Sequence, residues 1–202
     1  EDDIKNIAAM WNRGMKAHGF ALIKNHGVKN SLFSELETKW AEFFSKDLSA
    51  KMEYNYGSYG GPMGGYTPIG LEAVGRSNDG DVSIQPDIVE SFVYNRNALQ
   101  NEGGSDASNS LAKLSYEYFG AMEQLLQVLH TLSGVALEFN GTSPMFEGFD
   151  GKASDALRFA NYPALNDAIQ VETGVQGEFS AQEEPQRYAP HTDYQGFTIL
   201  CP

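Results

Sequence analysis

The 202-residue sequence contains a single cysteine, Cys201, and few basic residues. One cysteine cannot form a disulfide within the chain, so nothing here indicates an oxidising compartment. The sequence has 14 lysines and arginines against 27 aspartates and glutamates, which gives a formal net charge of −13 at pH 7. Nucleic acids and anionic membrane surfaces both attract positive charge, so this balance argues against either as a partner.

The sequence also lacks any apolar run long enough to span a bilayer, and it has no secretory signal, so we expect a cytoplasmic protein. Its hydrophobic content of 41% and aromatic content of 12% are typical of a globular chain, and its length fits one domain. The sequence begins at Glu1 without an initiator methionine and stops just after an apolar stretch. We therefore expect a fragment of a longer protein.

Apolar residues recur with helical spacing in three segments, which predicts amphipathic helices at about residues 3–17, 31–45 and 111–139. Asn30 or Ser31 is the expected cap of the second helix. Shorter apolar or alternating runs predict strands at residues 20–23, 87–94 and 156–162. The stretches between them, at residues 54–70, 95–110 and 164–186, are expected to be loops, the last a hairpin or a lid.

The stretch 186–200, QRYAPHTDYQGFTIL, contains the strongest chemical signal. Its residues are typical of a strand, and on a strand the side chains of His191 and Asp193 project from the same face. An imidazole and a carboxylate are two of the three ligands in the facial sites of non-haem iron oxygenases. A His-x-Asp tripeptide also occurs by chance on surface strands, so the pattern alone leaves both interpretations open.

Five segments, taken in order, resemble the isopenicillin N synthase-like family of Fe(II)- and 2-oxoglutarate-dependent dioxygenases. They are GFALIKNHGV, GGYTPIG, DIVESFVY, LRFANYP and HTDYQGFTIL. The resemblance implies an α+β fold in which amino-terminal helices pack on a double-stranded β-helix, or jelly-roll, that is incomplete in this chain. Residues 1–150 would form the amino-terminal helical and strand region, and residues 151–202 the start of the oxygenase jelly-roll core.

The same resemblance implies roles for individual residues. His191 and Asp193 match the iron ligands of the family, and Tyr162 matches the tyrosine that hydrogen-bonds the carboxylate of the cosubstrate 2-oxoglutarate. Arg158 and Tyr194 are candidates for the substrate pocket. In the family the position of His26 is a turn residue rather than a ligand. His130 falls within the longest predicted helix, where a hydrogen-bonded structural histidine is the simpler interpretation.

The expected reaction is oxidation of a small molecule, usually hydroxylation, that consumes O2 and 2-oxoglutarate at Fe(II). The family takes its third metal ligand from a later histidine and grips 2-oxoglutarate with the arginine of an R-x-S motif, and the 202 residues contain no match to either. We therefore expect the chain by itself to be inactive. Two alternatives remain open: an oxidase of the same fold that uses no 2-oxoglutarate, and a non-catalytic acidic binding domain.

Overall fold

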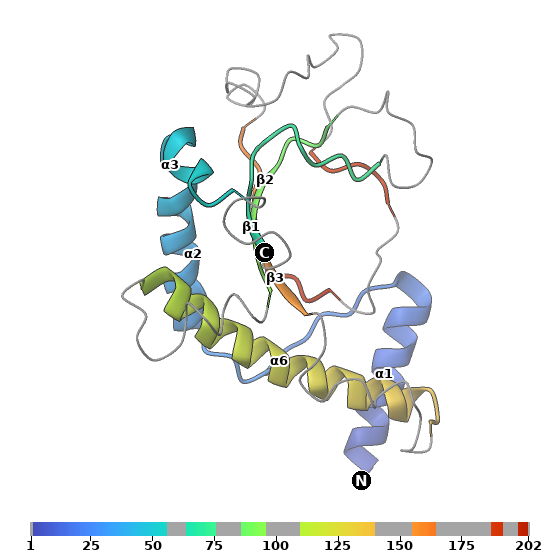
Figure 1. The fold of residues 1–202 in the computed structure, drawn as a ribbon. Helices are drawn as coiled ribbons and strands as arrows, with labels where there is room; N and C mark the ends of the chain where they lie inside the picture. Colours follow the sequence, from blue (N-terminus) through green and yellow to red (C-terminus); the bar gives the residue numbers. More distant parts are fainter. Residues whose placement is uncertain are drawn as a thin grey trace.

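The computed structural model is an α+β arrangement of helices and a small sheet (Figure 1). It describes residues 2–55, 64–75, 86–95, 110–139, 155–164, 187–191 and 198–201. The elements in chain order are α1 (Asp2–His18), α2 (Asn30–Phe44), α3 (Leu48–Met52), β1 (Gly64–Thr67), β2 (Glu90–Asn95), α6 (Ser110–Ala136) and β3 (Ala156–Asn161). None of the described helices is both long and apolar enough to cross a membrane.

The three strands form an antiparallel sheet in the order β1-β2-β3. Phe92 in the central strand lies opposite Tyr66 on one side and Phe159 on the other. Because side chains alternate along a strand, these three rings share one face of the sheet. The next pair along, Val93 and Arg158, belongs to the opposite face. One face therefore carries the three aromatic rings, and Arg158 lies on the other.

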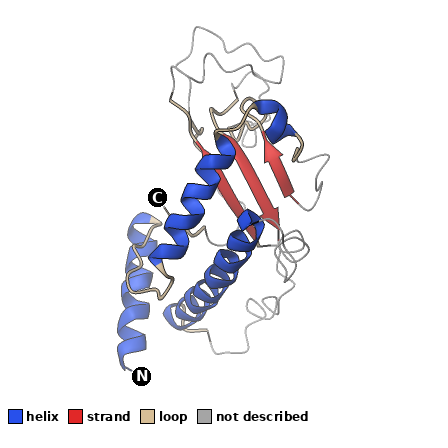
Figure 2. Ribbon diagram, turned by 90° about the vertical axis from the view of Figure 1, so that its left-hand side faces the viewer, coloured by secondary structure: helices blue, strands red, loops and turns tan. Residues whose placement is uncertain are grey.

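The core lies between the aromatic face and two helices, with Trp40 of α2 at its centre. The Trp40 ring stacks on Phe159 with centroids 4.2 Å apart and packs against Phe92 at 5.0 Å. The buried cluster contains Leu36, Trp40 and Phe43 of α2, Tyr66, Phe92 and Tyr94 of the sheet, and Tyr118 and Phe119 of α6. Figure 2 shows the helices beside the three strands. The helices thus bury the aromatic face of the sheet.

Helix α1 packs against the carboxyl-terminal part of α6 (Figure 1). The indole N–H of Trp11 donates to the Ser133 hydroxyl at 2.9 Å, and Ala8 is 1% exposed. The helix predicted for residues 3–17 is confirmed as α1, but its predicted apolar face is buried only in part, because Ile4 and Ile7 are 52% and 51% exposed. The predicted second and third helices are also confirmed, as α2 and α6. The N-cap of α2 is Lys29, which makes no side-chain capping bond, so the expected cap at Asn30 or Ser31 was wrong.

The prediction of a loop over residues 54–70 was wrong in part, because residues 64–67 form β1. Gly64 has a φ of +114°, and a Cβ placed on it would lie 2.1 Å from the Val93 carbonyl oxygen. Glycine is therefore required where this strand approaches β2 so closely. The pattern of glycines had predicted a loop, whereas Gly64 permits strand pairing here.

Two predicted strands are not regular strands in the residues that the structure describes. Residues 20–23 run as irregular chain, with Phe20 74% and Leu22 96% exposed. Within the stretch 186–200, the described residues 187–191 and 198–200 are also irregular. Neither segment pairs with the sheet in the described part of the chain, and an apolar pattern alone does not make a strand without a hydrogen-bonding neighbour. Of the connections predicted at residues 95–110 and 164–186, residues 96–109 and 165–186 lie outside the described residues.

Candidate metal centre

Three residues that the sequence singled out converge on a fourth, Tyr188. The His191 ring meets the Tyr188 ring edge to face, with centroids 4.9 Å apart and an interplanar angle of 85°. The Tyr162 ring meets it at 6.5 Å, and the Arg158 guanidinium lies over it at 5.4 Å from the centroid. The structure therefore brings His191, Tyr162 and Arg158 together around one aromatic ring.

The hydrogen bonding of His191 fixes which ring nitrogen can bind a metal. Its Nδ1 lies 2.9 Å from the backbone oxygen of Ala189. A carbonyl oxygen only accepts, so Nδ1 must carry the proton, and in the neutral ring Nε2 then keeps its lone pair. Metal-binding histidines are commonly oriented in this way, by donation from the other ring nitrogen to a backbone carbonyl. The residue as a whole is exposed.

Asp193 and Tyr194 lie outside the described residues, so their predicted roles stay predictions. Among the residues that the structure does describe, no three His, Cys, Asp or Glu side chains gather as a metal site. His191 is therefore the one predicted ligand whose surroundings can be tested. Its donor nitrogen fits a divalent transition metal such as Fe(II), for which imidazole is a suitable ligand.

Arg158 is paired with an acid that the sequence analysis did not single out. Its Nη2 donates to Glu72 Oε2 at 2.6 Å, and the other Glu72 oxygen accepts from the Ser91 hydroxyl. The pair is partly exposed, with 32% of the Arg158 side chain and 23% of the Glu72 side chain accessible. The Glu72 carboxylate compensates much of the positive charge that Arg158 would offer to an anionic ligand. The role of Arg158 in a substrate pocket stays a prediction.

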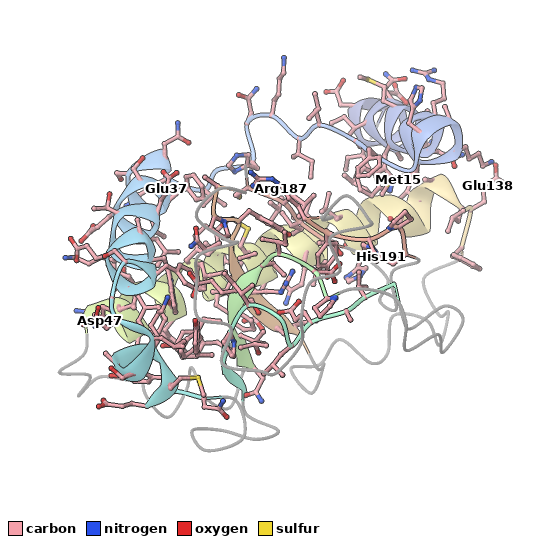
Figure 3. The ribbon with its side chains drawn as sticks, turned by 90° about the horizontal axis from the view of Figure 1, so that it is seen from above. Met15, Glu37, Asp47, Glu138, Arg187 and His191 are labelled. Atoms are coloured by element: carbon pink, nitrogen blue, oxygen red, sulfur yellow. The ribbon has the colours of Figure 1, made fainter. Side chains whose placement is uncertain are left out.

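Tyr162 and Tyr188 differ in how far they face solvent. Tyr162 follows β3, is 39% exposed, and its backbone oxygen accepts from Arg187 Nη1 at 3.2 Å. Burial raises the pKa of Tyr188, and the Arg158 guanidinium beside it offsets only part of that rise. The Tyr188 hydroxyl therefore stays protonated near neutral pH and can donate a hydrogen bond. Figure 3 labels Arg187 between Glu37 of α2 and Met15 of α1, with His191 below Met15 in this view.

The structure also describes the surroundings of the two other histidines considered from the sequence, His26 and His130. The Val28 N–H donates to His26 Nδ1 at 3.2 Å, within a turn where Asn25 and Gly27 adopt positive φ angles. This geometry agrees with the turn interpretation of His26. His130 lies on α6, half-buried, and burial lowers the pKa of its imidazole.

Sequence reasoning missed three residues that shape the site: Glu72, Asp87 and Tyr188. Asp87 is 1% exposed, and its carboxylate accepts from the backbone N–H of Val74 and of Ala189. A signal was available in the D-x-x-E pattern before β2, because an acid inside an apolar stretch needs hydrogen-bond partners if it is buried. The sequence does not reveal the partners of Asp87, because Ala189 lies 102 positions away from it in the chain.

Comparison with known proteins supports the resemblance seen in the sequence. Residues 1–111, more than half of the chain, match the family model described as the non-haem dioxygenase in morphine synthesis N-terminal domain. The 1-aminocyclopropane-1-carboxylate oxidases of Dictyostelium mucoroides and Dictyostelium discoideum are each 35% identical over 72 residues. That match covers 36% of this chain and only 20% of each oxidase.

The fold is similar to that of a full-length Neurospora crassa protein whose crystal structure was determined in complex with alpha-KG. The TM-score is 0.61 at 20% sequence identity, over 84% of this chain and 53% of the Neurospora protein. This likeness concerns the fold, and the chain spans about half the length of that neighbour. Together with the family model over residues 1–111, these findings show that the chain belongs to the Fe(II)/2-oxoglutarate-dependent dioxygenase family.

Proposed function

We propose that this chain supplies His191 and Asp193 to the Fe(II) site of an oxygenase that oxidises a small molecule with O2 and 2-oxoglutarate. The observation that carries the proposal is the bond from His191 Nδ1 to the Ala189 carbonyl, which leaves Nε2 as a metal donor. Membership of the dioxygenase family supports the choice of metal. The Neurospora protein of similar fold was crystallised with alpha-KG, and this supports the choice of cosubstrate.

In this proposal the protein's own residues bind and orient the reactants. His191 and Asp193 hold the metal, and the Tyr162 hydroxyl donates to a carboxylate of 2-oxoglutarate. Arg158 and Tyr194 border the substrate. The bound Fe(II) would supply the activation of O2. Tyr188, packed edge to face on His191, would limit rotation of the ligand ring.

The proposal extends to architecture and to the activity of the chain alone. Residues 151–202, with β3, would begin the jelly-roll core, and β3 pairs with β2 of the amino-terminal region, residues 1–150. A third ligand and the arginine that grips 2-oxoglutarate would come from sequence outside these 202 residues. Two ligands hold Fe(II) weakly, so we expect this chain alone to turn over no substrate.

A second candidate function is oxidation without 2-oxoglutarate. It is favoured by the match to the two Dictyostelium proteins, which are named as oxidases. A non-catalytic acidic binding domain is the third possibility, and the net charge of −13 is the feature that motivates it. Metal binding separates the third possibility from the first two, and binding of 2-oxoglutarate to the metal-loaded protein separates the first from the second.

The test is an anaerobic titration with Fe(II) and 2-oxoglutarate, on this chain and on a longer protein extended downstream. We expect the visible band of the Fe(II)–2-oxoglutarate chelate in the longer protein, lost in its His191→Ala variant and kept in His18→Ala, a change on α1. Fe(II) binding without that band would favour the oxidase. No Fe(II) binding in either protein would overturn the metal site and favour the binding domain.

A further inference from the structure

Asp87 is a buried acid that ties three separate parts of the chain together. Its side chain is 1% exposed and stands three residues before β2. Oδ2 accepts from the Val74 N–H at 2.7 Å, and Oδ1 accepts from the Ala189 N–H at 2.9 Å. Its own N–H donates to the Glu72 carbonyl at 2.8 Å. A buried carboxylate costs free energy unless it is hydrogen-bonded, and backbone N–H groups provide these bonds here.

The bond to Ala189 connects Asp87 to His191. Ala189 is 7% exposed; its N–H is held by Asp87, and its carbonyl accepts from His191 Nδ1 at 2.9 Å. Pro190 follows and has no N–H, so it cannot add an anchoring donor, and it restricts Ala189 to extended conformations. The position of the Ala189 carbonyl therefore depends on the contact of its own N–H with Asp87.

We propose that Asp87 is a positioning residue for the metal ligand His191. By fixing Ala189, it holds the carbonyl that keeps His191 in the Nδ1–H tautomer, in which Nε2 carries the lone pair that binds a metal. The effect of Asp87 on metal binding rests on the proposed function, whereas its effect on the His191 tautomer does not. The Tyr188 ring packs edge to face on His191 and limits its rotation, so the imidazole is held both by a hydrogen bond and by packing.

The variant that tests the proposal is Asp87→Asn, which keeps the size of the side chain. Its amide carries one acceptor oxygen and one NH2 group, so it cannot accept from both Val74 and Ala189 as two carboxylate oxygens do. The matched control is Glu90→Gln, a similarly buried acid at 4% exposure. Glu90 bonds to Lys51, Tyr66 and Asn161, which all lie outside the segment that carries Ala189.

The first measurement is the tautomer of His191, read from its two ring 15N chemical shifts at a pH where the ring is neutral. We expect the Nδ1–H form in the wild type and in Glu90→Gln, and a mixture of both forms in Asp87→Asn. The second measurement is the Co(II) affinity of the longer protein, from the visible absorption of the bound ion. We expect Asp87→Asn to weaken Co(II) binding by about 10- to 100-fold, the usual effect of removing a group that orients a ligand, and Glu90→Gln to leave it unchanged.

The outcomes separate this inference from the proposed function. If the wild type binds no Co(II) while Asp87→Asn still shifts the tautomer, the metal site fails and the positioning role stands. If Asp87→Asn binds Co(II) and shows the tautomer of the wild type, the positioning role is overturned. If Asp87→Asn does not fold, the wild type alone tests the positioning role. The test is the scalar coupling between Ala189 15N and Asp87 13Cγ across their hydrogen bond. We expect that coupling, and its absence together with an Nε2–H His191 would overturn the proposal.

Discussion

Lys51 Nζ lies 2.7 Å from Glu90 Oε2, and the two side chains keep only 10% and 5% of their exposure. The same carboxylate oxygen accepts from the Tyr66 hydroxyl at 2.5 Å, and the other oxygen accepts from Asn161 Nδ2 at 2.8 Å. One buried acid on β2 therefore joins α3, β1 and β3. Lys51 also donates to the Phe44 carbonyl at the end of α2, so it closes the link between helix and sheet.

We expect Lys51→Met to destabilise the fold, because it leaves Glu90 buried without its positive partner. Breaking one side of a buried ion pair costs roughly 3 kcal/mol or more in unfolding free energy, and urea denaturation measures it. The control is Lys39→Met, which removes an exposed pair with Glu42 and should change stability by less than about 1 kcal/mol. Equal losses in both variants would contradict the importance of the buried pair.

Two glycines should respond to alanine in opposite directions. At Gly64 a Cβ would lie 2.1 Å from the Val93 oxygen, at a φ of +114°, so Gly64→Ala should lower the unfolding free energy by at least about 2 kcal/mol. At Gly120, within α6, a Cβ meets nothing within 4 Å. Gly120→Ala should stabilise the chain by about 0.5–1 kcal/mol because alanine loses less entropy in a helix.

Thermal and urea unfolding of the two variants, compared with the wild type, checks this prediction. A Gly64→Ala variant as stable as the wild type would show that β1 does not approach β2 as closely as described. A destabilised Gly120→Ala would mean that α6 is less regular around Gly120 than its hydrogen-bonding implies.

The helices could be predicted from the sequence because their signal is local. The spacing of Ala8, Trp11 and Met15 is visible within one segment and confirmed in α1. Residues 20–23 have an equally clear apolar run, yet they form no strand, because a strand requires a partner that the run itself does not specify. β1 was missed for a different reason. Its glycines are typical of a loop, yet Gly64 is required there by the close approach of β1 to β2.

The sequence singled out His191 as a candidate ligand, a role that stays a prediction, but it did not reveal the geometry around this histidine. His191 could be picked out from a tripeptide, but its tautomer depends on the Ala189 carbonyl and, through Ala189, on Asp87. Tyr188, on which His191 and Arg158 converge, belongs to no pattern in the sequence. Contacts between residues so far apart in the chain arise from the tertiary fold, which one sequence does not reveal.

Alkaline pH should destabilise the protein through two buried tyrosines. Burial, followed by the bond to Glu90, raises the pKa of Tyr66. Burial also raises the pKa of Tyr118, whose hydroxyl donates to Cys201 Sγ at 2.8 Å. Above about pH 10 the unfolded state loses these protons while the folded state keeps them. Stability is therefore full below that pH and falls above it, by about 1.4 kcal/mol per pH unit for each tyrosine.

Urea denaturation between neutral and strongly alkaline pH measures this slope. Tyr118→Phe should reduce it by about 1.4 kcal/mol per pH unit, whereas Tyr116→Phe, on the exposed side of the same helix, should leave it as in the wild type. A wild-type stability that does not fall in alkali would contradict the prediction. An unchanged slope in Tyr118→Phe would instead assign the effect to other groups.

The contact between Arg158 and Tyr188 should depend on Glu72. The guanidinium lies 5.4 Å from the ring centroid while its Nη2 is held by Glu72 at 2.6 Å. A double-mutant cycle with Arg158→Met and Tyr188→Leu should give a coupling of about 0.5–1 kcal/mol, the range for a partly exposed cation–π pair. Repeated in a Glu72→Gln background, the coupling should fall, because the neutral amide no longer anchors the guanidinium against solvent.

A coupling that survives Glu72→Gln would show that Arg158 is held by the ring alone. Its charge would then be available to an anionic ligand beside His191, as the pocket role requires.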